Sequence, residues 1–351
     1  MRAKGAHIAG WVAAIAVTAV AVIAVMMVLA DSPGGGRATP EVQTVVPAPH
    51  PTTTVNPFQA PAMPARGAYL GAYVQPAAYT QAADIAAIQT LQSQLGRRLA
   101  IVHSYLRWQV PFPTISQQAI LNQGSTLLLS WAGTDTHAIN SGAYDGWIRQ
   151  QAHAIKAAHK QIFLEWRWEM DRQDLVAQVH SPRDYVRAWK RLRSIFASEH
   201  VKNVAWVWCP STKGFGLAIG HRPAPPFYPG NRQVDWLCAD AYPKAGETAS
   251  FASLVQPFLA WASHIRKPVM IGEFGAPRSY GPQARARWLR AAAQVVRGNS
   301  QIKALVYFDG DPAGHFPSMQ YHLDAGTAPL LAFRAIAAQR YFNPPLRRAP
   351  H

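Results

Sequence analysis

The chain has 351 residues, 49% of them hydrophobic, which is long enough for two average domains or for one large barrel. Its formal net charge is +16, and such a charge is typical of proteins that bind nucleic acid, an anionic membrane or an acidic polymer. Lysine and arginine form no run longer than a pair and no zinc-finger spacing is present, so the sequence argues against a nucleic-acid partner and leaves a solvated basic surface as the plainest interpretation.

The first 66 residues contain an apolar segment followed by a linker. Residues 8–30 carry no charge and follow Arg2 and Lys4, so this segment is long enough to cross a bilayer, with the rest of the chain outside the cytoplasm. Small residues up to Ala30 would also suit a signal peptidase, so the chain is either anchored in the membrane, which the segment's length favours, or secreted after cleavage there. Residues 31–66 are rich in proline, glycine and threonine, which predicts an extended tether.

From residue 67 to residue 345, short apolar runs alternate with amphipathic stretches, a pattern typical of βα units. Eight such strands within about 280 residues predict a single (β/α)8 TIM barrel. The expected strands are 69–74, 100–105, 126–131, 161–167, 204–208, 234–240, 268–273 and 304–308. The clearest expected helices are 144–159, 182–199, 251–264, 282–298 and 328–341. The stretch 210–232 is rich in glycine and proline and is expected to be a long loop.

Two carboxylates follow apolar strands and are the first candidates for catalysis. Glu273 ends the apolar strand 268–273, where a buried charge is costly, and such a position is typical of a catalytic carboxylate. Glu169 follows the strand 161–167. Active sites of such barrels lie at the C-terminal ends of the strands, so both carboxylates are expected on the same face. A pair of carboxyl groups is the minimum needed to hydrolyse a glycosidic bond.

Other side chains near the expected strand ends are candidates for binding a sugar. Flat aromatic rings suit the apolar C–H faces of sugars, although such rings also pack at barrel rims, and a single histidine is as often structural. The candidate substrate-binding residues are His103, Trp108, Trp131, Trp168, Trp208, Asp240 and Phe308.

Strand alternation adds an arginine to this set. It would place Glu165, Arg167 and Glu169 on one face of the strand. Arg167 would then lie between the two carboxylates, neutralising Glu165 and orienting Glu169. The alternative is an ion pair between Glu165 and Arg167 inside the barrel that has no part in catalysis.

Several segments, in this order and spacing, carry a family resemblance. The segment 268–275, Pro-Val-Met-Ile-Gly-Glu-Phe-Gly, is similar to the motif PxMIGEFG of one enzyme family. Residues 168–172, Trp-Glu-Met-Asp-Arg, occupy the position of a second motif of the same family, HEMNG. Shorter matches cover residues 70–74, 101–103, 142–148 and 228–242. Together they resemble glycoside hydrolase family 26, which includes many bacterial β-mannanases.

The resemblance implies roles for particular residues. It makes Glu273 the nucleophile and Glu169 the general acid/base of a retaining mechanism, in which the two carboxyl groups lie about 5–5.5 Å apart. It also implies that Tyr242 donates a hydrogen bond to the nucleophile and favours its charged form. Two positions depart from the family pattern, Trp168 for histidine and Asp171 for asparagine, so the contacts around the sugar should differ from those of a typical mannanase. Asp171 adds a negative charge near Glu169, which would raise the pKa of Glu169.

The function expected from these features is a retaining endo-β-glycosidase, most simply one that hydrolyses β-1,4-mannan or a related mannan or glucan. A non-catalytic protein that binds carbohydrate or organises the cell envelope on a barrel scaffold is the alternative, and an enzyme acting on an acidic polymer is a third. We expect neither a cofactor nor a metal, because the sequence has no dinucleotide fingerprint, P-loop or spaced ligand cluster. Cys209 and Cys238 lie near the ends of consecutive strands, where either a disulfide or two buried thiols would fit.

Overall fold

The computed structural model describes residues 56, 58–216, 218–244, 246–312, 316–324 and 326–344. The expected membrane segment, residues 8–30, lies outside these residues, as does the tether up to residue 55. Among the helices that are described, none is both long and apolar enough to cross a membrane. The end of the expected tether contacts the barrel, because the amide of Gln161 donates hydrogen bonds to the carbonyl oxygens of Asn56 and Ala60 at 3.2 and 3.5 Å.

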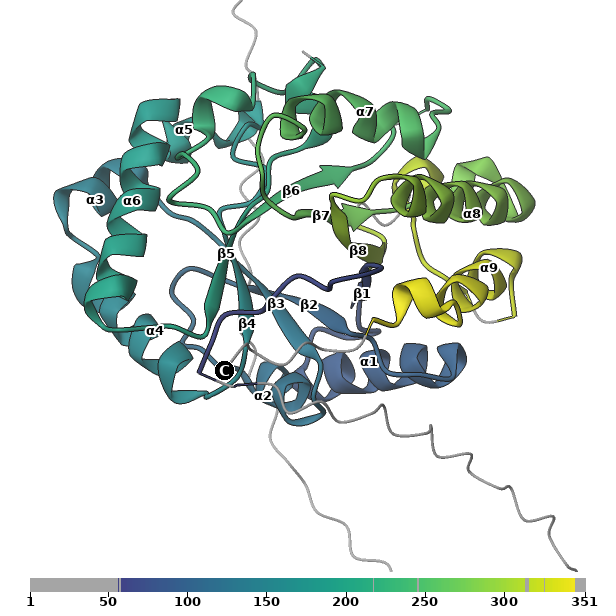
Figure 1. Ribbon diagram of the computed structural model, residues 1–351, viewed down its shortest axis with the longest axis horizontal. Coiled ribbons are helices and arrows are strands. Elements are labelled where there is room, and N and C mark those ends of the chain that lie inside the picture. The colour runs from purple at the N-terminus through teal and green to yellow at the C-terminus, as the bar shows by residue number, and fades with distance from the viewer. Residues whose placement is uncertain are drawn as a thin grey trace, which may run out of the picture. The chain divides into compact units, whose positions relative to one another are not determined.

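Eight parallel strands form a closed barrel in which each strand pairs with the next and β8 pairs with β1 (Figure 1). The strands are β1 Tyr69–Val74, β2 Ile101–Leu106, β3 Thr126–Trp131, β4 Ile162–Trp166, β5 Val204–Trp208, β6 Trp236–Ala241, β7 Val269–Phe274 and β8 Ile302–Asp309. The predicted (β/α)8 barrel is therefore confirmed, and every strand lies within two residues of its expected bounds.

Helices surround the barrel on its outer side (Figure 1). They are α1 Gln81–Leu95, α2 Ile115–Asn122, α3 Thr136–Ser141, α4 Asp145–Ala157, α5 Val176–Val179, α6 Pro182–Ser198, α7 Phe251–Ala262, α8 Pro282–Gly298 and α9 Ala328–Ala337. The helices α6 and α8 begin with a proline, which suits the first turn because an N–H group there has no hydrogen-bond acceptor within the helix. The expected loop 210–232 is confirmed where described, since it contains only the 3₁₀ turns Thr212–Phe215 and Pro225–Phe227.

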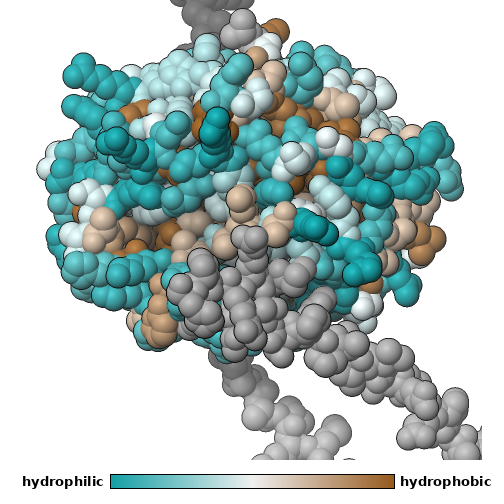
Figure 2. Space-filling view, viewed as in Figure 1, coloured by the Kyte–Doolittle hydropathy of each residue, from teal (hydrophilic) through white to brown (hydrophobic). Residues whose placement is uncertain are grey.

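Apolar side chains fill two concentric layers, one inside the barrel and one between the barrel and the helices. The inner layer consists of Tyr69, Ile101, Leu128, Phe163, Ala205, Val207, Cys209, Trp236, Cys238, Met270, Ala304 and Val306. Strands buried on both faces have continuous apolar sequences rather than alternating ones, which is why these segments stood out in the sequence. Hydrophilic residues cover most of the face shown in Figure 2, with small apolar areas between them.

A disulfide joins two neighbouring strands inside this inner layer. Cys209 follows β5, Cys238 lies in β6, and their sulfur atoms are bonded with the Cα atoms 4.3 Å apart. Of the two arrangements that the sequence left open, the structure therefore has the disulfide. Structural disulfides of this kind are typical of proteins outside the reducing cytosol.

Replacing Trp189 on α6 with alanine should destabilise the barrel strongly. Its ring is fully buried against Trp166 and Tyr185, and its indole N–H donates to the carbonyl oxygen of Gln233 at 3.0 Å. Removing a buried tryptophan typically costs about 3–5 kcal/mol, which should appear as a lower midpoint in chemical unfolding. The neighbouring exposed Lys190→Ala is the control and should change stability by less than about 0.5 kcal/mol. Equal effects of the two substitutions would contradict this account of the core.

Candidate active site

A cavity of about 590 Å³ lies at the C-terminal ends of the strands and contains both predicted catalytic carboxyl groups. Aromatic, acidic and basic side chains share its wall. The lining residues are Tyr105, Trp168, Glu169, Arg172, Lys213, His221, Tyr242, Pro243, Glu273, Phe308, Pro312, Met319 and Tyr321. The barrel therefore brings Glu169 and Glu273, which are about a hundred residues apart in the sequence, to the same cavity.

Glu273 lies near the end of β7 and is held by two tyrosines. The hydroxyl of Tyr242 donates a hydrogen bond to Glu273 Oε2 at 2.9 Å, and the hydroxyl of Tyr105 donates one to Oε1. The bond from Tyr242 is the one that the family resemblance implied. The bond from Tyr105, at the end of β2, is an addition that the sequence did not indicate.

These bonds act against burial in setting the pKa of Glu273. Burial disfavours the charged carboxylate, and the nearby charge of Glu169 adds to this effect, so the pKa of Glu273 is raised to about 7. Hydrogen bonds from Tyr105 and Tyr242 favour the charged form and lower the pKa in the opposite direction. The two tyrosines thus promote ionisation of a carboxyl group that burial alone would keep protonated.

Glu169 follows β4 on a stretch of unusual backbone. Arg167 and Glu169 have φ angles of 53° and 47°, in the left-handed region that non-glycine residues rarely adopt. The backbone N–H of Glu169 donates to the carbonyl oxygen of Cys209 at 2.8 Å, which ties this turn to the end of β5. Strained backbone of this kind is often found where a side chain must be placed for function.

The pKa of Glu169 is also raised above its ordinary value, mainly by burial. Asp171 raises it further, as the sequence suggested, whereas Arg172 lowers it from a distance of 3.2 Å between Nη1 and Glu169 Oε2. The two carboxyl groups repel each other, so they titrate as a coupled pair. The tyrosine bonds favour the charged form of Glu273, which makes Glu169 the group suited to hold a proton.

The expected position of Arg167 is wrong. The strand ends at Trp166 and the left-handed backbone interrupts the alternation, so the Arg167 side chain packs against Gly133 and donates a hydrogen bond to Gln178. Among the described residues it pairs with neither glutamate, which excludes both the bridging arginine and the internal ion pair. Glu165 instead accepts a hydrogen bond from Ser130, and burial raises its pKa well above the ordinary value, which favours its neutral form.

Asp171 is fully buried behind the cavity wall rather than exposed to a sugar. Its carboxylate accepts hydrogen bonds from the backbone N–H of Ser211 and from His221 Nδ1, both at 2.9 Å. Its carbonyl oxygen accepts from the backbone N–H of Arg222 at 2.7 Å. Asp171 therefore positions the loop that follows β5, and it affects Glu169 by charge and not by contact with substrate.

The other candidate sugar contacts divide into two groups. Trp168 and Phe308 line the cavity. The candidates that lie outside its described wall are His103, Trp108, Trp131, Trp208 and Asp240, and all five are buried.

Each buried candidate has a packing role that explains its place. His103 bonds to Ser130 Oγ at 2.6 Å inside the barrel, and Trp108 stacks on Trp131 with ring centroids 4.5 Å apart. Trp208 packs in the outer layer against Trp261, and Asp240 lies beside the disulfide. The final residue of a strand can face either the cavity or the surrounding helices. Trp131 and Trp208 face the helices and are core residues, so their assignment as sugar contacts is wrong.

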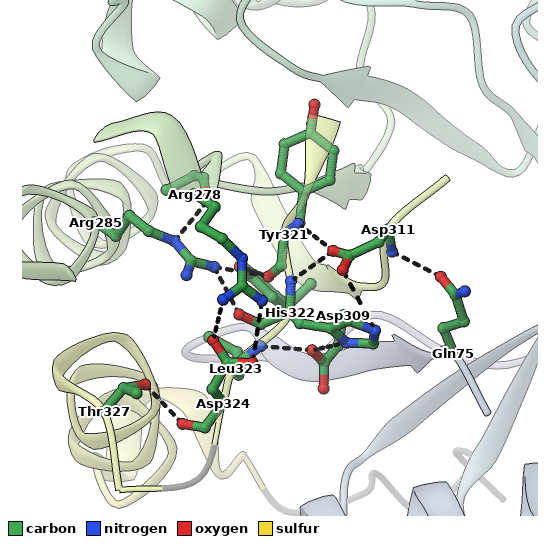
Figure 3. A network of polar contacts seen from close by, with 12 residues as sticks. Gln75, Arg278, Arg285, Asp309, Asp311, Tyr321, His322, Leu323, Asp324 and Thr327 are labelled. Atoms are coloured by element: carbon green, nitrogen blue, oxygen red, sulfur yellow. Dashed lines mark hydrogen bonds and ion pairs between the residues drawn. The ribbon is translucent and has the colours of Figure 1, made fainter. Parts of the chain in front are cut away.

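Several cavity residues come from loops and gave no signal in the sequence. Among them is Tyr321, whose backbone belongs to a polar network that follows β8 (Figure 3). Its N–H donates to Asp311 Oδ1 at 2.9 Å, and its carbonyl oxygen accepts from Arg285 at 2.9 Å. Asp309, at the end of β8, accepts from the N–H of Leu323 at 2.7 Å. The ring of Tyr321 points away from this network, which thus fixes the loop while leaving the ring free to line the cavity (Figure 3).

Replacing Tyr242 with phenylalanine should weaken the candidate nucleophile. The substitution removes a hydrogen bond that favours ionised Glu273, so the pKa of Glu273 should rise and the acidic limb of the kcat/KM profile should move to higher pH. A hydrogen bond to a charged group contributes about 1.5–3 kcal/mol, so activity should fall by about ten- to a hundredfold. Tyr341→Phe, which removes a hydroxyl bonded to Val296 far from the cavity, should leave the profile in place. An unmoved acidic limb in Tyr242→Phe would contradict this role.

A parallel (β/α)8 barrel with two carboxyl groups in one cavity at the C-terminal ends of its strands has the architecture of a glycoside hydrolase. A scan against models of known protein families finds no match to this chain. The chain is 30% identical over 267 residues to "Endoglucanase H" from Acetivibrio thermocellus, an alignment that covers 69% of this chain and 28% of that protein. The chain thus spans less than a third of the length of this curated relative.

Solved structures share the fold at low sequence identity. A modular endo-β-1,4-mannanase of glycoside hydrolase family 26 from Cellulomonas fimi is 15% identical, with a TM-score of 0.58 over 82% of this chain and 77% of that one. A family 26 β-mannanase from Bacteroides ovatus is 13% identical, with a TM-score of 0.57 over 79% of this chain and 90% of that one. The resemblance of this chain to glycoside hydrolase family 26, which its motifs indicated, is thereby confirmed.

Proposed function

We propose that this protein is a retaining endo-β-glycosidase that hydrolyses a β-linked polysaccharide by double displacement. The observation that carries the proposal is the pair Glu169 and Glu273 in one cavity, with two tyrosine hydroxyls bonded to Glu273. The similarity to a curated endoglucanase and the fold shared with endo-mannanases support the same class of reaction.

In the first step, Glu273 attacks the anomeric carbon while Glu169 donates its proton to the departing glycosidic oxygen. The result is a covalent glycosyl-enzyme and a released chain end. In the second step, Glu169 removes a proton from water, and the hydroxide portion displaces Glu273 from the same carbon. Trp168 and Phe308 would contact the apolar faces of the bound sugars.

The proposed substrate is β-1,4-mannan or a related mannan or glucan. The names of the similar proteins, an endoglucanase and several mannanases, support this range. The alternative of a non-catalytic binding protein was motivated by the departures at Trp168 and Asp171. Asp171 lies behind the cavity wall, so only Trp168 alters the surface that faces a sugar.

We also propose that the catalytic domain acts outside the cytoplasm, on a membrane anchor formed by residues 8–30 or after cleavage near Ala30. The Cys209–Cys238 disulfide supports an oxidising location. Recovery of the full-length protein from the membrane fraction would support the anchor. Recovery from the medium, with a new N-terminus after residue 30, would support secretion.

Release of reducing ends from a panel of polysaccharides tests the proposed activity. The full chain is incubated with β-mannan, glucomannan, mixed-linkage β-glucan and β-1,3-xylan, and proton NMR follows the anomeric form of the first product. A retaining enzyme should release the β-anomer first. Initial release of the α-anomer would contradict double displacement, and binding without release would favour the non-catalytic alternative.

A further inference from the structure

The polar part of the cavity wall is mostly basic. Arg172, Lys213 and His221 line it, and the only acidic groups among the described lining residues are Glu169 and Glu273. The basic side chains come from the loops that follow β4 and β5. Aromatic rings from β2, from β8 and from the loops after β4, β6 and β8 also line the wall, so a ligand in the cavity would meet cations as well as flat rings.

Lys213 is half-buried, and its ammonium group has neither a hydrogen bond nor an ion pair with any described residue. Burial lowers its pKa, and the negative charges of Glu169 and Asp171 act in the opposite direction. Partly burying a cation without a partner is costly. A ligand that brings a negative charge to Lys213 would offset this cost.

The loop that carries Lys213 is closely built around Asp171. The Lys213 backbone N–H donates to Ser211 Oγ at 3.3 Å, and the Ser211 N–H donates to Asp171. A Cβ atom on Gly214 would lie 2.5 Å from Asp171 Oδ2 and 2.8 Å from the Cβ atom of Ala224, so only glycine permits this approach. Contacts of the neighbouring residues therefore fix the position of Lys213 on the cavity wall.

The other two basic residues already have partners among the described side chains. Arg172 pairs with Asp174 at 2.7 Å and with Glu169 at 3.2 Å, which holds its guanidinium beside the candidate acid. His221 Nδ1 is bonded to Asp171, and its Nε2 has no partner among the described residues. Three potential donors thus lie on the wall beside Glu169, and two of them are oriented by buried or paired carboxylates.

We propose that the polysaccharide bound in this cavity is anionic, and that its carboxylate, sulfate or phosphate groups contact Lys213 and Arg172. The inference rests on the proposed glycosidase activity, and it narrows the proposed substrate to an acidic polymer in place of a neutral mannan or glucan. Basic side chains bonded to anionic oxygens form short, strong hydrogen bonds, which would select such a polymer over a neutral one. The net charge of +16 would also increase the rate at which an acidic polymer reaches the cavity.

An anionic substrate would also assist the chemistry. Arg172 and Lys213 both favour the ionised form of Glu169, whereas catalysis needs Glu169 protonated at the start of the cycle. A substrate anion placed between these cations would reduce their effect on Glu169. The general acid would then keep its proton more readily with an acidic substrate bound than with a neutral one.

Matched substrates and matched variants test the inference. Mixed-linkage β-glucan and β-mannan are each prepared in neutral form, with part of the C6 groups oxidised to carboxylates, and in sulfated form. The ratio of kcat/KM for the charged polymer to that for the neutral one is measured for the full chain and for Lys213→Met, Lys213→Arg and Lys190→Met. Lys190 is exposed on the outer helix α6, so its loss removes the same charge from the far surface.

We expect the wild-type chain to prefer one charged form by about tenfold or more, the scale of one charge-assisted hydrogen bond. The ratio should fall by about tenfold in Lys213→Met, recover in Lys213→Arg and stay unchanged in Lys190→Met. Preference for the oxidised polymer would identify carboxylates as the ligand, and preference for the sulfated one would identify ester anions. Equal ratios in all variants, or a preference for the neutral polymers, would overturn the inference while leaving the glycosidase intact.

Binding separates failure of the inference from failure of the proposed function. The same glycans are titrated into Glu273→Gln by calorimetry, which needs no turnover. Tighter binding of a charged form that depends on Lys213 would support an anion-binding cavity even if the wild-type chain hydrolyses none of the polymers. Equal binding of charged and neutral forms, or binding of neither, would overturn it.

Discussion

Replacing Glu273 with glutamine is expected to lower kcat by at least about 10⁴-fold, the scale observed when a covalent nucleophile is lost. Glutamine has nearly the same shape and can still bond to Tyr105 and Tyr242, so the fold should persist. Its neutral amide cannot attack the anomeric carbon, and the glycosyl-enzyme therefore cannot form. Release of reducing ends measures the loss of kcat, and the midpoint of chemical unfolding shows whether the fold persists.

The control for this variant is Glu247→Gln. Glu247 is exposed in the loop after β6, where it pairs with Lys244 at 3.5 Å, and it does not line the described cavity wall. The substitution removes the same charge without touching the site, so activity should stay within about twofold, as is usual for surface changes. Activity of Glu273→Gln within tenfold of the wild type would remove Glu273 from the nucleophile position.

The sequence predicted the barrel well because its strands are buried on both faces. The run 204–208 is apolar throughout and 126–131 has only Thr126 and Ser130 as polar residues, and the structure gives the strands β3 and β5 the same bounds. Helix starts were also predictable where a proline marks the first turn, as in α6 and α8. Helix ends were less so, because α9 stops at Ala337 rather than continuing to residue 341.

Side-chain direction at the strand ends was harder to predict. Period-two alternation predicts directions only while the backbone stays extended, and the left-handed residue Arg167 ends that regularity. Alternation also does not say which face of a strand points into the barrel and which points towards the helices. Trp131 and Trp208 point towards the helices. The place of Glu273 in the cavity was easier to predict, because a family motif and a buried strand end both pointed to it.

The basic residues of the cavity had no periodic or compositional signal. Lys213 and His221 lie in the long loop after β5, and their placement depends on the contacts of Asp171 with that loop. The net positive charge of the chain was visible in the sequence, but the gathering of basic side chains beside Glu169 was not. Contacts between loops that are far apart in sequence decide this part of the site, and a single sequence does not specify them.

Replacing Glu169 with alanine should have an effect that depends on the leaving group. Without a general acid, hydrolysis of a polysaccharide should slow by about 10²–10⁴-fold. An aryl glycoside whose phenol leaves without protonation should form the glycosyl-enzyme at nearly the wild-type rate and then accumulate it, because no base activates water. The alkaline limb of the pH profile should also disappear, since that limb reports loss of the proton from Glu169.

Azide supplies a direct test of this assignment. It is a nucleophile that needs no general base, so it should accelerate breakdown of the accumulated intermediate in Glu169→Ala and yield a β-glycosyl azide. Glu199→Ala is the control, because Glu199 forms ion pairs with Arg149 and His153 at the far end of α6. It should show neither the slow step nor azide rescue. A Glu169→Ala variant that loses activity equally on both kinds of substrate and ignores azide would place the general acid at another residue of the cavity.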